Sequence, residues 1–199
     1  TQQGLIGEDG AVEFTKGGIS LTPLVMADGQ WLTWADVELK QSLQDGYLPI
    51  PSVDWKHPDF GLRVTTFVHG DDHQSQMLAR YQLTNTGSAE KEFILALAAQ
   101  PWQVNPPTQF LSTQGGFSPA RFLSINQDGE VMTDPDGLVD GVLENLGIAV
   151  RALQVPDATL ATSFDEGMVV ERLMGEGELF AEGPVRPSAA GDDMGLASG

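Results

Sequence analysis

The segment Phe93–Ala99 (FILALAA) restricts the possible fold more than any other stretch of the sequence. Successive residues of a β-strand point to opposite faces of the sheet. In this segment both faces are apolar: one carries Phe93, Leu95 and Leu97, and the other carries Ile94, Ala96 and Ala98. A strand with two apolar faces is typical of a central strand that is covered on both sides. We therefore predict packed β-layers around this segment.

The residues before this segment predict strands that bury only one face. From Gln76 to Thr84, apolar and polar residues alternate with a period of two, and the same alternation runs from Phe60 to Val68. The connection at 85–90 (NTGSAE) contains residues that favour turns. We interpret residues 60–99 as a three-stranded antiparallel meander.

The first sixty residues predict shorter strands joined by turns. Strands are expected over Ala11–Phe14 and from Ile19 to Val25, followed by a hairpin turn at Asp28-Gly29. The alternation from Trp31 to Lys40 predicts one strand, with Trp34 and Asp36 on its polar face. Residues 41–51 (QSLQDGYLPIP) then predict a loop with a turn at Asp45-Gly46.

The second half of the sequence has weaker patterns. Residues 122–132 predict a hairpin across Gln127-Asp128-Gly129, and a long loop is expected after Trp102. The capping box Ser163–Glu166 predicts one short helix near residues 165–174. The expected fold class is thus mainly β, an antiparallel β-sandwich or supersandwich with one short helix, forming a single domain over residues 1–199.

The charge balance limits the partners of the chain. Ten basic and twenty-eight acidic residues give a net charge of −18, which repels nucleic acid and anionic membrane surfaces. We therefore expect no nucleic-acid binding. We also expect no membrane insertion, because no apolar run reaches the ~20 residues of a membrane helix. The acidity suits a solvated surface in extracytoplasmic (periplasmic or secreted) surroundings. The absence of cysteine excludes disulfides and thiolate chemistry.

From the two ends of the sequence we expect the chain to be part of a larger multidomain protein. The sequence begins at Thr1 without a signal-peptide pattern. The final residues, GDDMGLASG, resemble the approach to a further strand.

No catalytic or cofactor motif is complete. The segment GFSPA around Ser118 has alanine where a nucleophile elbow needs glycine. His69 and His73 flank a turn and could share a metal with an aspartate, but a solvated turn is favoured. Residues 134–145 lack the glycine and glutamate of an EF-hand loop. We therefore expect no catalytic residue, no metal and no cofactor, and no enzymatic activity of this segment alone.

The tryptophans are better candidates for a functional site. Aromatic side chains beside carboxylates or amides suit stacking on sugar rings. The candidate ligand-binding residues are Trp34, Asp36, Trp55 and Trp102. The alternative is that these tryptophans are core and loop residues of a β-sandwich, as tryptophans more often are.

Two segments carry a resemblance to a known family. They are WADVELKQSLQDGYLPIPSVDW (34–55) and ARYQLTNTGSAEKEFILALAAQPWQVNPPTQF (79–110). With the final GLASG, they resemble the galactose-mutarotase-like β-supersandwich of large bacterial proteins that also carry coagulation factor 5/8 type (discoidin) domains and a glycosidase-like helical toroid. The resemblance covers most of the chain, but the sequence lacks the paired histidines of mutarotases. It implies a supersandwich packed against an (α/α)6 toroid that carries the catalytic acid and base, and it assigns no catalytic residue here.

The leading hypothesis is therefore a non-catalytic accessory domain of a carbohydrate-active, glycoside hydrolase-like protein. Its partners would be neighbouring domains of the same polypeptide and carbohydrate. An autonomous glycan-binding module and a structural immunoglobulin-like spacer are the alternatives.

Overall fold

The chain folds into antiparallel β-sheets, which confirms the predicted mainly-β sandwich. The computed structural model describes residues 4–14, 19–71, 74–100, 123–133, 147–163, 170, 173–174 and 195–198. The strands are β1 Leu5–Ile6, β2 Val12–Glu13, β3 Ser20–Ala27, β4 Gln30–Leu32, β5 Glu38–Leu43, β6 Pro51–Lys56, β7 Phe60–Gly70, β8 Ser75–Asn85, β9 Phe93–Gln100, β10 Leu123–Ile125, β11 Glu130–Thr133, β12 Gly147–Arg151, β13 Leu160–Ser163 and β14 Gly195–Ser198. Two 3-10 helices, η1 Trp34–Asp36 and η2 Gln44–Gly46, flank β5.

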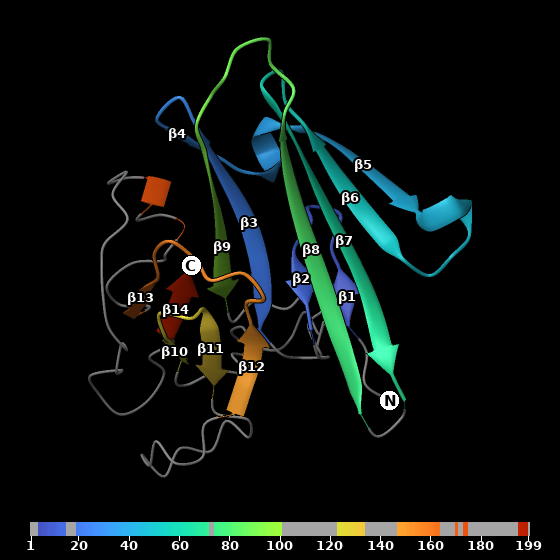
Figure 1. Cartoon of the computed structure of the whole chain (residues 1–199), viewed down its shortest axis with the longest axis vertical. Coiled ribbons are helices and arrows are strands. Elements are labelled where there is room, and N and C mark those ends of the chain that lie inside the picture. The colour runs from blue at the N-terminus through green and yellow to red at the C-terminus, as the bar shows by residue number, and fades with distance from the viewer. Residues whose placement is uncertain are drawn as a thin grey trace, which may run out of the picture.

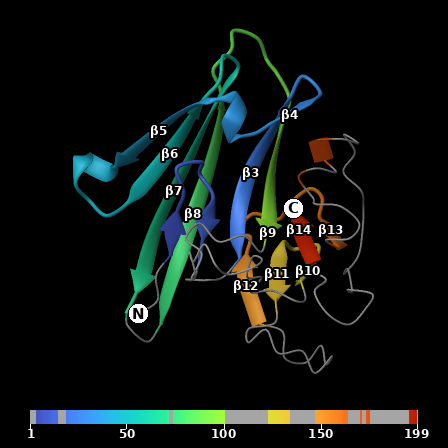
Figure 2. The same ribbon diagram turned by 180° about the vertical axis from the view of Figure 1, so that it is seen from behind.

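The strands form three sheets (Figure 1). The seven-stranded sheet has the order β1-β2-β3-β9-β14-β13, and β4 pairs with β3. The four-stranded sheet has the order β5-β6-β7-β8, and the small sheet has the order β10-β11-β12. Seen from behind in Figure 2, the long strands β7 and β8 lie on one side of the molecule, and β9, β13 and β14 lie on the other.

Strand β9 is the central strand that its two apolar faces predict. It pairs with β3 on one side and with β14 on the other. Leu95 and Phe93 pack against the core shared with the four-stranded sheet. On the opposite face, Ala96 and Ala98 form a cluster with Leu173 of the helical segment.

The predicted three-stranded meander over residues 60–99 is wrong in one respect. Strands β7 and β8 pair along their whole length, but β9 leaves β8 and joins the seven-stranded sheet. The physical reason is that the inner face of β8 is apolar while its outer face is largely polar, so a partner in the same sheet would expose one face of β9. Within the seven-stranded sheet, one face of β9 packs on the core shared with the four-stranded sheet, and the other packs on the cluster that contains Leu173.

The predicted single strand from Trp31 to Lys40 is also wrong. The chain leaves the ladder at Thr33 and forms the 3-10 helix η1 before β5 begins in the other sheet. The backbone N–H of Thr33 donates to the Asp36 carboxylate at 2.8 Å, and the Thr33 hydroxyl accepts from the Ala35 N–H at 3.3 Å. Such local bonds between side chains and backbone compete with strand pairing.

Other local predictions have mixed outcomes. The hairpins at Asp28-Gly29 and across residues 127–129 are confirmed by the β3–β4 and β10–β11 pairs. The predicted loop 41–51 is shorter, because β5 extends to Leu43 and η2 follows. Of the helix predicted near 165–174, the described residues Val170, Leu173 and Met174 are helical. The final residues, expected to approach a missing strand, are themselves strand β14.

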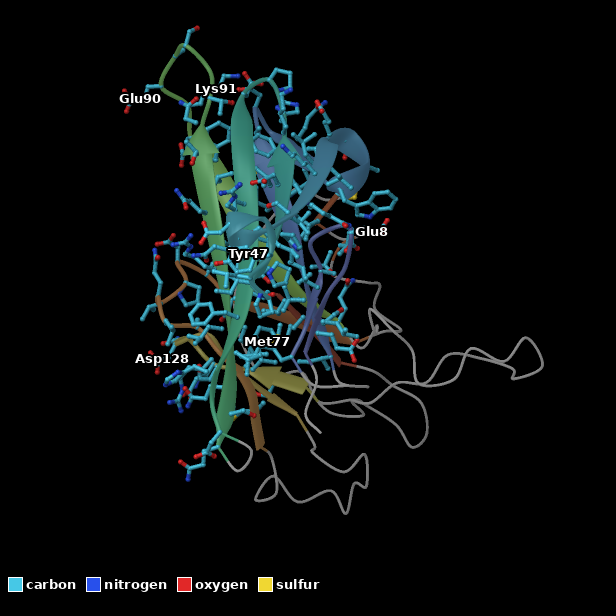
Figure 3. The ribbon with its side chains drawn as sticks, turned by 90° about the vertical axis from the view of Figure 1, so that its right-hand side faces the viewer. Glu8, Tyr47, Met77, Glu90, Lys91 and Asp128 are labelled. Carbon is cyan, nitrogen blue, oxygen red and sulfur yellow. The ribbon has the colours of Figure 1, made fainter. Side chains whose placement is uncertain are left out.

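Lys91 links the two large sheets at one end of the sandwich. It lies between β8 and β9, and its Nζ is 2.7 Å from Asp28 Oδ2 and 2.9 Å from Asp59 Oδ1. Asp28 belongs to the β3–β4 turn, and Asp59 belongs to the connection between β6 and β7. Hydrogen bonds to Asp28 and then Asp59 raise the pKa of Lys91 above its ordinary value. Figure 3 shows Lys91 in the loop at the end of the long strands.

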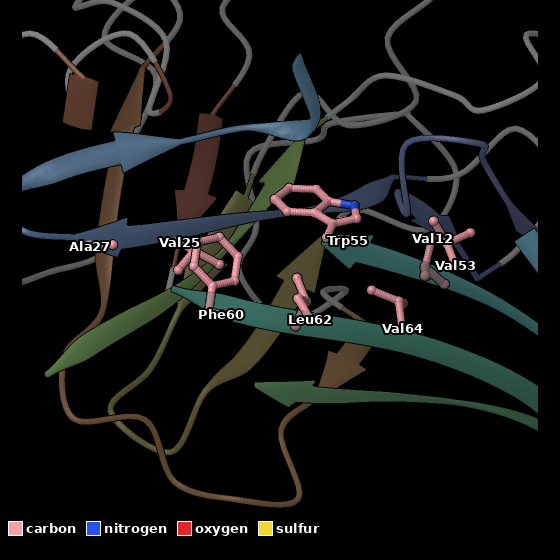
Figure 4. Close-up of a cluster of buried hydrophobic side chains, with 8 residues drawn as sticks. All are labelled: Val12, Val25, Ala27, Val53, Trp55, Phe60, Leu62 and Val64. Atoms are coloured by element: carbon pink, nitrogen blue, oxygen red, sulfur yellow. The ribbon is translucent and has the colours of Figure 1, made fainter. Parts of the chain in front are cut away.

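The main core lies between the two large sheets (Figure 4). Its fully or nearly fully buried members are Val12, Val25 and Ala27 from the seven-stranded sheet, and Val53, Trp55, Phe60, Leu62 and Val64 from the four-stranded sheet. A second cluster joins the seven-stranded sheet to the small sheet through Ile125 and Val131. The sandwich is thus stabilised by burial of alternate residues from facing sheets.

Tyr81 is an exception within this core. Its ring packs against the main core, but its hydroxyl is buried without a hydrogen-bond partner in the part of the chain that the structure describes. Burial raises the pKa of this hydroxyl far above its ordinary value, so it stays protonated at physiological pH. An unpaired buried hydroxyl destabilises the folded state.

We expect Tyr81→Phe to raise the free energy of unfolding by about 1 kcal/mol, because it removes the unpaired hydroxyl and keeps the ring. Urea denaturation measures the change. Tyr47→Phe is the matched control, since Tyr47 is 76% exposed and its hydroxyl meets water; this variant should stay within about 0.5 kcal/mol of the parent. A loss of stability in Tyr81→Phe alone would contradict this account of the core.

Candidate functional site

A cleft with a volume of about 940 Å³ opens on the surface of the sandwich. The turn between β1 and β2, the strands β3 and β9 and the 3-10 helix η1 line most of it, and Leu39 of β5 and the helical residue Val170 also contribute. Its size is within the range of small-molecule sites in proteins. Its described polar lining residues are Glu8, Asp9, Ser20, Thr22, Thr33 and Gln100.

The turn between β1 and β2 brings Glu8 and Asp9 to the cleft. It is closed by two backbone hydrogen bonds, from the Gly7 N–H to the Ala11 carbonyl and from the Gly10 N–H to the Gly7 carbonyl. The Asp9 carboxylate accepts the N–H of Ala11 through Oδ1 at 2.9 Å. Gly10 has a φ of 88°, a conformation that favours glycine.

Trp55 holds this turn from inside the protein. Its side chain is 1% exposed, and its indole N–H donates to the backbone carbonyl of Asp9 at 2.9 Å. In Figure 4 the indole nitrogen lies on the side of the ring away from Phe60 and toward Val12 and Val53. The buried indole therefore connects the main core to the turn that lines the cleft.

Trp34 lies on another side of the cleft and is half exposed, with 50% of its side chain accessible. It is the first residue of η1, and Thr33 before it forms a capping box with Asp36. The Asp36 Oδ2 atom accepts from both the N–H and the hydroxyl of Thr33, at 2.8 and 3.0 Å. These bonds fix the backbone that presents the Trp34 ring.

The strands contribute a polar pair to the cleft. The Thr22 hydroxyl donates to Gln100 Oε1 at 3.0 Å, which joins β3 to β9 across the sheet. Gln100 is only 5% exposed, and its neighbour in register, Ser20, is 2% exposed. A buried and hydrogen-bonded amide is held in one orientation, so this part of the cleft is rigid.

The cleft combines one exposed aromatic ring with hydrogen-bonding groups. Sugar rings have apolar C–H faces that stack on indoles and hydroxyls that bond to carboxylates and amides. Glycosidase chemistry needs two carboxylates on opposite sides of the scissile bond, ~5 to 9 Å apart. Glu8 and Asp9, the acids among the described lining residues, are adjacent on one turn.

The four residues predicted to bind a ligand have different positions. Trp34 lines the cleft, and Asp36 orients its backbone. Trp55 is buried, so it presents no face for stacking on a sugar, and it positions the Asp9 turn instead. Trp102 lies outside the described residues.

The sequence prediction did not find the six polar residues of the cleft: Glu8, Asp9, Ser20, Thr22, Thr33 and Gln100. The sequence marks Glu8-Asp9-Gly10 as a turn, but it gives no sign that this turn faces η1. Gln100 ends the apolar strand β9, and a polar residue with only 5% exposure at the end of such a strand is the signal that was available.

Three other candidates from the sequence, His73, Ser118 and residues 134–145, lie outside the described residues. Among the described residues, no group of three or more His, Asp or Glu side chains is placed to hold a metal ion. None of the described residues belongs to a helix with the length and hydrophobicity of a transmembrane span.

Fold and cleft together define an antiparallel β-sandwich with a partly aromatic surface cleft. Comparison with protein-family models, curated proteins and solved structures gives no match.

Proposed function

We propose that this chain is a non-catalytic accessory β-sandwich domain of a carbohydrate-active protein and that it binds glycan in the cleft beside Trp34. The observation that carries the proposal is the half-exposed Trp34 ring on a cleft that also contains carboxylates and an amide. The resemblance of residues 34–55 and 79–110 to the supersandwich of glycoside hydrolase-like proteins supports the same class of ligand.

Trp34 differs from a core tryptophan in its exposure to solvent. A residue that serves only the fold is usually buried, as Trp55 is. Trp34 leaves half of its surface to solvent, although the capping box holds its backbone in place. An exposed ring on a backbone that is already held in place costs less conformational freedom when a ligand stacks on it.

We expect Trp34→Ala to weaken glycan binding at least about tenfold, because it removes the stacking surface. The free energy of unfolding should change by no more than about 1 kcal/mol, since the ring is half exposed. The measurement is calorimetric titration with neutral hexasaccharides of glucose, xylose, mannose and N-acetylglucosamine, together with urea denaturation.

Tyr47→Ala is the control for this experiment, because Tyr47 is an exposed aromatic residue next to η2 that does not line the cleft. It should leave binding unchanged. Absence of saturable binding to every hexasaccharide, or equal loss of binding in both variants, would refute the proposal.

A packing role against a neighbouring domain is the second candidate. The tip of the β5–β6 hairpin exposes Leu43 by 46% and Tyr47 by 76%, and apolar side chains of this kind suit a domain interface. We expect amide hydrogen exchange at residues 43–50 to slow in a longer natural polypeptide that contains this chain. Unchanged exchange in such a polypeptide would remove the hairpin tip as the packing surface.

A further inference from the structure

We infer that the cleft selects glycans by charge and prefers sugars that carry a free amine over neutral sugars and uronic acids. This inference rests on the proposed function, because it concerns the ligand class of the same cleft. It names hexosamine-containing oligosaccharides as the preferred ligands.

The first step is the charge of the lining. The described residues that line the cleft include two acids, Glu8 and Asp9, and no lysine, arginine or histidine. The whole chain carries a net charge of −18, so no distant excess of positive charge offsets them. A bound uronate would meet like charge, whereas an ammonium group would meet opposite charge.

The second step is the hydrogen-bonding capacity of Asp9. Its Oδ1 accepts the N–H of Ala11, and its backbone carbonyl accepts the indole N–H of Trp55. The first contact orients the carboxylate and the second holds the backbone of Asp9, while Oδ2 accepts no hydrogen bond from the residues that the structure describes. A fixed carboxylate oxygen is an acceptor, and its strongest partners are charged donors such as ammonium groups.

The third step places this acceptor relative to the stacking residue. Asp9 and Trp34 come from different elements, the β1–β2 turn and η1, and both line one cleft. A sugar stacked on Trp34 can therefore direct a substituent to the Asp9 turn. Glu8 extends the same acidic side toward solvent, and Figure 3 shows it at the edge of the molecule.

The test compares oligosaccharides of different charge, two of which, the chitosan and chitin tetramers, share one glucosamine backbone. Chitosan tetramer carries free amines, chitin tetramer has the same sugars with neutral acetamides, and a galacturonate tetramer is anionic. At about 150 mM salt we expect the parent chain to bind chitosan tetramer about three- to tenfold more tightly than chitin tetramer, and galacturonate tetramer least tightly.

Asp9→Asn isolates the carboxylate. Asparagine keeps an Oδ1 that accepts the Ala11 N–H, so the turn is retained. This variant should bring the chitosan-to-chitin affinity ratio close to one. Glu90→Gln is the matched control: it also removes one negative charge, and Figure 3 places Glu90 on the β8–β9 loop, well separated from Glu8. The ratio should persist in Glu90→Gln.

Each outcome has a distinct meaning. Absence of binding to all three tetramers refutes this inference, and the glycan-binding function fails with it only if the neutral hexasaccharides also do not bind. If chitin tetramer binds in a Trp34-dependent manner but chitosan tetramer is not favoured, the glycan site stands and the charge selection is refuted. An equal fall of the ratio in Asp9→Asn and Glu90→Gln also refutes it, because net charge alone would then explain the preference.

Discussion

Trp55→Ala is expected to lower the free energy of unfolding by about 3–5 kcal/mol, the usual cost of removing a buried tryptophan. The side chain is 1% exposed and lies in the main core with Phe60 and Leu62. Its loss leaves a cavity between the two large sheets, and the carbonyl of Asp9 also loses its indole donor. The variant should therefore destabilise the core and loosen the turn that lines the cleft.

Urea denaturation measures the first effect, and amide exchange at residues 7–11 measures the second. Trp55→Phe separates them, because phenylalanine fills most of the core volume but has no N–H. We expect Trp55→Phe to cost less than the alanine variant, about 1–3 kcal/mol, while the exchange of the turn still rises. Unchanged exchange at 7–11 in Trp55→Phe would show that the indole bond does not hold the turn.

Gly10→Ala is expected to be the second most damaging change, with a loss of about 2–4 kcal/mol. Gly10 has a φ of 88°, a conformation that costs an alanine about 1–2 kcal/mol. A Cβ at this position would also lie 3.3 Å from the Nε1 atom of Trp55. The turn must therefore shift away from the indole, which weakens the bond to Asp9.

Gly29→Ala is a matched control for this change, because Gly29 has a φ of 77° and a Cβ added there would have no neighbouring atom within 4 Å. It carries the conformational cost alone. Thermal and urea unfolding should rank Gly10→Ala clearly below Gly29→Ala in stability, and only Gly10→Ala should weaken glycan binding. Equal losses in the two variants would show that the contact with Trp55 contributes nothing.

The sequence predicts the faces of the long strands well. Period-two alternation identifies the inward-facing residues of β7 and β8, and the two apolar faces of Phe93–Ala99 identify a central strand. These predictions succeed because a side chain's face depends only on its position along the strand. The turns at Asp28-Gly29 and Asp45-Gly46 are also predicted from local sequence. All four residues have positive φ, which aspartate and glycine tolerate better than most residues.

The partners of the strands could not be predicted in the same way. Periodicity shows that β9 needs cover on both faces, but it does not say that β3 and β14 supply its neighbours. Likewise, the alternation from Trp31 to Lys40 is compatible with one strand until the bonds between Thr33 and Asp36 end it. Strand pairing between distant segments is decided by packing, which local patterns do not contain.

The candidate site was predicted in part. Trp34 is detectable because a large aromatic residue stands among charged residues. The burial of Trp55 could have been inferred from its spacing to Val53. The two residues are two positions apart on β6, and both lie on its inner face. Its bond to Asp9 joins residues 46 positions apart and has no local signal. The acidic side of the cleft was missed for the same reason.

The pairing of β9 also has a consequence for how the chain reaches its native state. In register, Phe93 faces Ala27 and Ala99 faces Ala197, so both neighbours of the most apolar strand come from remote parts of the sequence. Contacts of high sequence separation form late, and folding is slow when they dominate. During that delay FILALAAQ has neither edge paired, and such a segment is prone to intermolecular association. Soluble production of this protein should therefore depend on the temperature and concentration at which it refolds.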